Sequence, residues 1–322
     1  VFITRIVYEH FMNKDKWLNL TFTTKISKNL MTNTHFDFMG TNKKSLIIVS
    51  AIIVVCIGSF AIRGLSQSID FTGGRNFKVQ FENPVEPEQV RELISSKFGD
   101  ANVSVIAIGT DKKTVRISTN YRIEDEGNNV DSEIESYLYE TLKPVLTQNI
   151  TLETFIDRDN HTGGSIVSSQ KVGPSIADDI KTGAIYSVVL ALLAIGLYIL
   201  LRFRNIAYSI GSIVALSCDT IMIIGAYSLF WGILPFSLEI DQTFIGAILT
   251  AIGYSINDKV VIFDRVREFF GLYPKRDKRQ LFNDSLNTTL ARTINTSLST
   301  LIVLLCIFIL GGDSIRSFAF AM

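Results

Sequence analysis

The sequence predicts a polytopic α-helical membrane protein with five complete transmembrane helices, the start of a sixth, and an external ferredoxin-like α/β domain between the first and second helices. Three observations predict this fold class: several apolar segments of membrane-spanning length, an alternation of basic and non-basic connections, and one long polar region with strand and helix patterns. Soluble domains of 322 residues do not usually carry several such apolar segments.

The apolar segments set the number of predicted helices, because a membrane span needs roughly 17–25 mostly apolar residues. A sixth apolar run begins near Ser314, close to the last residue, Met322. The chain has no initiating Met, and its first residues, VFITRIVYEHF, are typical of the end of an earlier membrane helix, so we expect a fragment of a longer membrane protein. The five complete segments are 45–62, 184–201, 206–230, 243–263 and 289–310.

The charges of the connections predict the orientation. Lysines precede the first segment, Arg202 and Arg204 separate the second and third, and six Lys or Arg residues follow the fourth. The connections after the third and fifth segments, WGILPFSLEIDQ and GGDS, contain neither. Because basic connections stay in the cytoplasm, the polar region is predicted to lie outside. The predicted divisions are 1–42 (end of a preceding helix and cytoplasmic connector), 43–66 (first transmembrane helix), 67–182 (extracytoplasmic domain) and 183–322 (remaining transmembrane helices).

The polar region has the pattern of one folded domain. Alternating apolar residues predict strands, and a spacing of three and four predicts helices. The resulting order, βαββαβ, is that of a ferredoxin-like sandwich. The region gathers no catalytic groups, which favours a binding or mechanical module. The predicted strands are 76–82, 101–109, 113–119 and 150–157, the predicted helices are 86–99 and 130–146, and 161–183 is predicted to be a link to the second span.

Charged residues interrupt three of the spanning segments: Asp219, Asp258 and Arg292. An ionised Asp near the membrane centre costs about 2.5–3.5 kcal/mol on insertion scales, so such residues normally face the helix bundle or a water-filled cavity. Burial disfavours the charged form of a carboxyl group, which makes Asp258 a candidate proton carrier. The alternatives are a fixed salt bridge or hydrogen bond that joins helices for Asp258, and an Arg292 side chain that reaches the membrane surface.

Small and polar residues recur at helical spacing beside Asp258, and Gly253, Ser255 and Asn257 are predicted to line a close helix contact there. Lys259 follows Asp258 directly and therefore points in a different direction. It is predicted to reach the membrane surface or to contact another helix.

Several classes of function have no support in the sequence. The three cysteines lie in apolar segments, the three histidines are far apart, and neither set has metal-ligand spacing. There is no phosphate-binding loop, no nucleophile–base pair and no sign of nucleic-acid binding. We therefore expect no enzyme activity, no metal and no cofactor, with protons as the coupling ion. The residues are Cys56, Cys218, Cys306, His10, His35 and His161.

Four motifs in order resemble the SecF family of protein-export membrane subunits, within the resistance–nodulation–division superfamily. They are DFTGG (70–74), ALSCDTIMIIGAYSLF (215–230), IGYSINDKVVIFDRVRE (252–268) and ARTINTSLSTLIVLLCIFILGG (291–312). The resemblance covers roughly Lys43 to Met322, and the preceding residues are similar to the end of SecD. The chain thus resembles the SecF portion of a SecD–SecF fusion.

The resemblance implies an accessory role in the Sec pathway of the bacterial inner membrane, in which the proton gradient promotes late preprotein translocation and residues 67–182 lie in the periplasm. It implies SecD and SecYEG as partners, YajC and YidC as further candidates, and unfolded preprotein at the outer domain. Two positions depart from the family pattern: Lys259 replaces a small polar residue, and Cys218 replaces a frequent His. The implied site residues are Asp258, Arg292 and Asp219 for the proton pathway, and Asp70, Phe71, Thr72, Gly73 and Gly74 for the turn after the first span.

Two other readings of the residues stay open. One is a proton-coupled efflux transporter of small molecules or lipids. A single outer unit of about 120 residues argues against it, because such a unit offers little room for a substrate cavity. The other is a passive scaffold in which Asp258 only joins helices.

Overall fold

A computed structural model describes residues 2–12, 34–99, 101–108, 111–125, 129–147, 150–159, 164–234, 236–311 and 313–322. The first helix, α1 (Phe2–Met12), falls where the end of a membrane helix is predicted. Most of the predicted connector, residues 13–33, lies outside the described residues.

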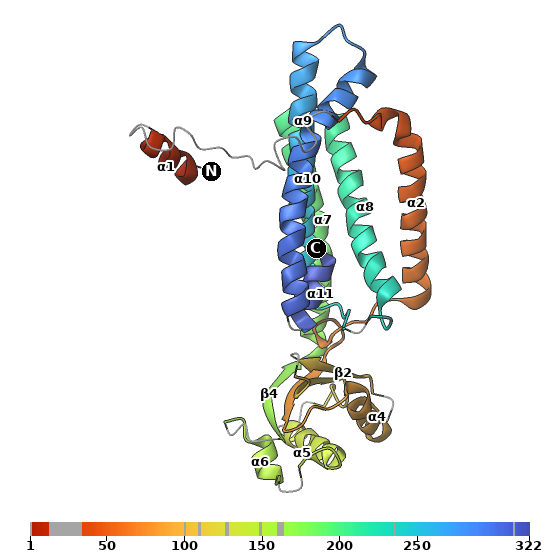
Figure 1. Cartoon of the computed structure of the whole chain (residues 1–322). Helices are drawn as coiled ribbons and strands as arrows, with labels where there is room; N and C mark the ends of the chain where they lie inside the picture. Colours follow the sequence, from red (N-terminus) through yellow and green to blue (C-terminus); the bar gives the residue numbers. More distant parts are fainter. Residues whose placement is uncertain are drawn as a thin grey trace.

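Five long helices form the membrane part and confirm the predicted spans. They run side by side, with the α/β domain at one end and the turn between α9 and α10 at the other (Figure 1). Most helices extend past the predicted apolar segments, because polar residues at the membrane surface continue the same helix. The helices are α2 (Phe38–Arg63), α7 (Pro174–Phe203), α8 (Ile206–Phe230), α9 (Gln242–Leu272) and α10 (Lys278–Leu310), followed by the shorter α11 (Asp313–Ala321) near the sixth predicted segment.

Helices α2 and α8 pack closely at Gly225. A Cβ atom added there would lie 2.1 Å from the Cβ of Cys56, far inside van der Waals contact. At the domain end of the pair, the Ser59 and Ser228 hydroxyls lie 3.1 Å apart, and Ser228 donates to the Gly64 carbonyl at 2.8 Å. The absence of a side chain at Gly225 therefore determines how near α2 lies to α8.

Gly225→Ala is expected to destabilise the protein by about 1–3 kcal/mol, the usual effect of overpacking. Gly211→Ala is the matched control on the same helix, because no atom lies within 4 Å of its added Cβ. Thermal unfolding in detergent measures both variants. Equal melting temperatures for the two would contradict the close contact.

The α/β domain contains a four-stranded antiparallel sheet in the order β2-β3-β1-β4, which confirms the ferredoxin-like arrangement. Alternate residues of the central strands, such as Phe77, Val79 and Ile117, are buried against helices on one face of the sheet. The strands are β1 (Gly74–Phe81), β2 (Val103–Ile108), β3 (Thr114–Thr119) and β4 (Gly164–Val172), and the helices are α3 (Ile69–Thr72), α4 (Pro87–Phe98), α5 (Val130–Leu142) and α6 (Leu152–Ile156).

The predicted final strand, 150–157, is wrong. These residues form α6, in which the Thr151 hydroxyl accepts a hydrogen bond from the Thr154 amide at 3.3 Å and Phe155 is fully buried. The strand that pairs with β1 is instead β4, in the segment predicted to be a link. Only Ile166 anchors β4 in the core, so its apolar alternation is weak.

Candidate functional site

Helix α9 carries the intramembrane acid and starts at the base of the α/β domain. Its cap residue, Asp241, accepts hydrogen bonds from the Phe244 amide at 2.9 Å and the Thr243 hydroxyl at 2.6 Å. Phe244 and Ile248 are buried on the face that packs against other helices. The helix is therefore anchored at its first turn, about 16 residues before Asp258.

Asp258 is half-buried and faces α10. Its Oδ1 accepts a hydrogen bond from the Thr296 hydroxyl at 3.5 Å, which is long for an O–H donor. The same hydroxyl lies closer to two carbonyls of its own helix, at 2.9 and 3.1 Å. Among the described residues, Asp258 is thus held loosely, by one shared hydroxyl.

Arg292 lies one helical turn before Thr296 on α10, and its side chain is exposed. Residues four apart share a helix face, so Arg292 flanks the contact that Asp258 makes. No ion pair joins Arg292 to Asp258 in the described part of the chain. The predicted partners therefore form no ion pair in the described part of this conformation.

Asp219 has a different environment. Its Oδ2 accepts a hydrogen bond from Ser255 at 2.6 Å and forms an ion pair with Lys259 Nζ at 2.9 Å. Lys259 also donates to the Ser255 hydroxyl. Asp219 comes from α8 and the other two residues from adjacent turns of α9, so the group joins the two helices. We call Asp219, Ser255 and Lys259 the intramembrane ion-pair cluster.

The cluster explains the direction of the Lys259 side chain. It contacts another helix, α8, which is one of the two predicted alternatives. The cluster also places Ser255 with Asp219 rather than around Asp258. The sequence analysis allowed Lys259 a contact with another helix but did not identify Asp219 as its partner. The available signal was the combination of a lysine and an acid in neighbouring spans, with Ser255 and Lys259 four residues apart on one helix face.

Gly253 and Asn257 lie on an exposed face of α9, together with Gly246 and Thr250. No atom lies within 4 Å of an added Cβ at either glycine. The close helix contact predicted for this face is not made by any described helix of this chain. We call these four residues the open face of α9.

The turn after the first span sits where the α/β domain meets the membrane helices. Gly73 and Gly74 have φ angles of +72° and +152°, and a Cβ on Gly74 would lie 2.8 Å from the Thr119 carbonyl oxygen. Phe71 is buried in the membrane-side core, and the Thr72 hydroxyl donates to the Ser68 carbonyl at 3.1 Å. The positive φ angles and the close approach to Thr119 favour glycine at both positions.

Asp70 in the same turn makes a contact that the sequence did not predict. Its Oδ2 accepts a hydrogen bond from the Gln242 amide at 3.2 Å. An acid at the first amides of a helix satisfies free N–H groups and complements the positive end of the helix dipole. Asp70 therefore connects the turn to the start of the helix that carries Asp258.

Comparison with known proteins gives the family. Residues 127–322 match the family described as protein export membrane protein SecD/SecF, C-terminal, and residues 58–85 match the SecD/SecF GG motif. The chain belongs to the SecD/SecF family. The turn with Asp70, Gly73 and Gly74 lies within the GG-motif match, and Asp219, Asp258 and Arg292 lie within the C-terminal match.

Comparison with individual SecF and SecDF proteins supports the same family assignment. Protein translocase subunit SecF of Rhodothermus marinus is 37% identical over 290 residues, which cover 90% of this chain and 87% of the relative. SecF of Haemophilus influenzae is 30% identical, over 89% of this chain and 79% of the relative. The crystal structure of SecDF from Thermus thermophilus, a translocon-associated membrane protein, superposes with a TM-score of 0.71 at 28% identity. That match covers 91% of this chain and 36% of the SecDF chain. This chain is therefore a multi-pass membrane protein of the Sec protein-export pathway.

Proposed function

We propose that this chain uses the proton gradient to promote preprotein translocation, and that Asp258 is the residue that takes up and releases the proton. One observation carries the choice of Asp258. Asp219 has a lysine at 2.9 Å, which balances its charge, whereas Asp258 has, among the described residues, only the Thr296 hydroxyl at 3.5 Å. A proton that binds to Asp258 removes a charge that no described cation balances, and such a change in charge alters helix packing inside a membrane.

The proposed movement involves α9 and α10. When Asp258 is charged, it attracts Arg292, which lies one turn from the Thr296 contact on α10. When Asp258 is protonated, that attraction is lost and the two helices separate or slide. The start of α9 is hydrogen-bonded to Asp70, so the movement is passed to the turn below the α/β domain.

SecD is the proposed partner for the open face of α9. The face contains small and polar residues, which favour close packing and hydrogen bonding between membrane helices. In the SecDF relative, a sequence similar to this chain makes up about a third of a longer chain. We further propose SecYEG as the channel that this complex serves, YajC and YidC as accessory partners, and unfolded preprotein as the ligand of the α/β domain.

The basic connections support a location in the bacterial inner membrane with the α/β domain in the periplasm. Arg202 and Arg204 lie between α7 and α8, and six Lys or Arg residues lie between 265 and 279 around the turn from α9 to α10. Both connections are at the end of the bundle opposite the α/β domain (Figure 1). Positive residues mark the cytoplasmic side.

The test is preprotein translocation into inverted membrane vesicles that contain SecYEG and either contain or lack the full-length protein with SecD. ATP for the translocation motor is saturating, and a protonophore removes the gradient in a parallel sample. We expect the gradient to accelerate translocation only in vesicles that contain the protein. An equal effect of the gradient in both kinds of vesicle would contradict the proposal, and gradient-driven transport of a small hydrophobic dye without any effect on preprotein would favour an efflux transporter.

A further inference from the structure

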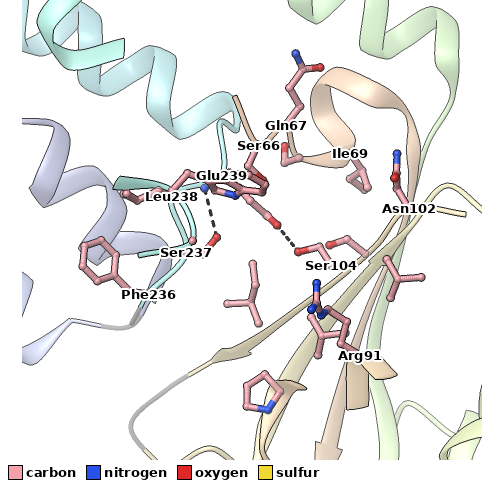
Figure 2. Close-up of a pocket in the computed structure, with 18 of the residues that line it drawn as sticks. Ser66, Gln67, Ile69, Arg91, Asn102, Ser104, Phe236, Ser237, Leu238 and Glu239 are labelled. Atoms are coloured by element: carbon pink, nitrogen blue, oxygen red, sulfur yellow. Dashed lines mark hydrogen bonds between the residues drawn. The ribbon is translucent and has the colours of Figure 1, made fainter. Parts of the chain in front are cut away.

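A hollow of about 1110 Å³ separates the α/β domain from the loop that precedes α9. Figure 2 shows the loop on one side and the sheet on the other, with Glu239 and Ser104 joined by a hydrogen bond across the space. The hollow lies between the two parts of the chain rather than inside the α/β domain. It is bounded by residues 231–234 and 236–239 of the loop, the segment 65–73 and strand β2.

Glu239 is a residue of the loop that contacts the sheet. Its carboxylate accepts a hydrogen bond from the Ser104 hydroxyl of β2, and its Oε2 lies 3.5 Å from a guanidinium nitrogen of Arg116 on β3. The Glu239 side chain is 9% exposed, and that of Arg116 is 20% exposed. Glu239 Oε2 and Arg116 Nε have no hydrogen-bond partner among the described residues, so the ion pair is incomplete. A buried carboxylate with incomplete partners contributes a contact that small movements can break.

The loop around Glu239 is also fixed to the start of α9. The Ile240 amide donates to the Ser66 carbonyl at 2.8 Å, and the Ser68 amide donates to the Ile240 carbonyl at 3.0 Å. Asp241 is the cap residue of α9. A displacement of the sheet therefore acts, through Glu239, on a segment that leads within two residues into the cap of the helix that carries Asp258.

We propose that Glu239 is a positioning residue that holds the α/β domain against the start of α9 through Ser104 and Arg116. We call these three residues the Glu239 contact. The Glu239 contact sets the position of the domain whether or not the protein acts in translocation. A role of the Glu239 contact in coupling rests on the proposed function. If Asp258 takes up and releases protons, a domain held at the start of α9 moves with that helix.

The pH dependence of the contact is a second consequence. Burial raises the pKa of Glu239, opposed by the Ser104 hydrogen bond and the Arg116 charge and reinforced by the charge of Asp241. The docked domain therefore binds a proton at Glu239 more tightly than the undocked domain does, so lower pH favours docking and higher pH weakens it. The other charged residues that line the hollow are Glu86, Glu88, Arg91, Lys112 and Arg316.

The experiment measures the distance between spin labels at Glu140, an exposed residue of α5, and at Ile62, an exposed residue near the end of α2. Electron–electron double resonance is recorded on the full-length protein with SecD, with Cys56, Cys218 and Cys306 replaced by alanine. Glu239→Ala and Ser104→Ala are each expected to lower the ratio of docked to undocked molecules about ten-fold, because each leaves a buried hydrogen-bonding partner unsatisfied. Glu92→Ala, which removes an exposed acid of α4, is the matched control and is expected to change nothing.

Three further results separate a positioning role from general destabilisation. The double variant Glu239→Ala, Ser104→Ala is expected to be no worse than Glu239→Ala alone, because Glu239→Ala already removes the Ser104 hydrogen bond. Glu239→Gln is expected to keep the domain docked and to abolish the change in docking between pH 5 and pH 8. Unchanged distances in Glu239→Ala, or additive losses in the double variant, would overturn the proposal. Neither result would affect the translocation test of the proposed function.

Discussion

Lys259→Met is expected to destabilise the membrane part severely, and a second substitution, Asp219→Asn, is expected to restore most of the lost stability. The single variant leaves the Asp219 carboxylate without the ammonium group that lies 2.9 Å away. An unbalanced Asp in the centre of a span costs about 2.5–3.5 kcal/mol, and a loss of this size is expected. The double variant removes both charges and leaves side chains of similar size.

Unfolding in mixed detergent micelles measures the effect, with the folded fraction followed as the proportion of denaturing detergent rises. Lys181→Met is the matched control, because Lys181 is an exposed lysine near the start of α7. If Lys259→Met were as mild as Lys181→Met, the ion-pair cluster would have no structural role. If the double variant were less stable than both single variants, the charges would not be coupled.

Asp258→Asn is expected to abolish proton entry during translocation and to leave stability almost unchanged. Asparagine keeps the shape of the side chain and can still accept the Thr296 hydrogen bond, but it cannot bind or release a proton. The measurement is the decay of a preformed pH gradient in vesicles, reported by a pH-sensitive dye while preprotein is translocated.

The control for this prediction is the stable double variant Lys259→Met, Asp219→Asn. It removes Asp219, the intramembrane acid of α8, and keeps the local charge balance because Lys259 is removed as well. We expect the double variant to retain proton entry. Loss of proton entry in the double variant together with full entry in Asp258→Asn would assign the proton pathway to Asp219 instead.

The spans and most of the strands could be predicted because their signals are local. A membrane helix is read from the length of one apolar segment, and a strand such as β1 is read from the alternation of its own residues. Strand β4 was not predicted, because its own residues alternate weakly and its pairing with β1 makes it a strand. Helix α6 was predicted as a strand, because the pattern of ITLETFID does not reveal the burial of Phe155 or the Thr151 cap. Tertiary contacts decided both segments.

In the site, too, some features have a local signal in the sequence and others depend on tertiary contacts. The acids could be singled out because charge in an apolar segment is visible in the sequence. Their partners could not, since the rotation of α9 about its axis decides that Lys259 points to α8 while Asp258, the preceding residue, points to α10. The contacts of Asp70 with Gln242 and of Glu239 with Ser104 join residues more than 130 positions apart, and no local pattern predicts them.

The most direct test of the central claim is preprotein translocation into inverted vesicles that contain SecYEG, SecD and the full-length protein, with Asp258 intact or replaced by asparagine. Each variant is measured with and without a proton gradient at saturating ATP, and expression and complex assembly are matched. The proposal predicts that the gradient accelerates translocation with Asp258 and has no effect with Asp258→Asn. Equal acceleration by the gradient in both would contradict it and would leave Asp258 as a residue that only joins α9 to α10.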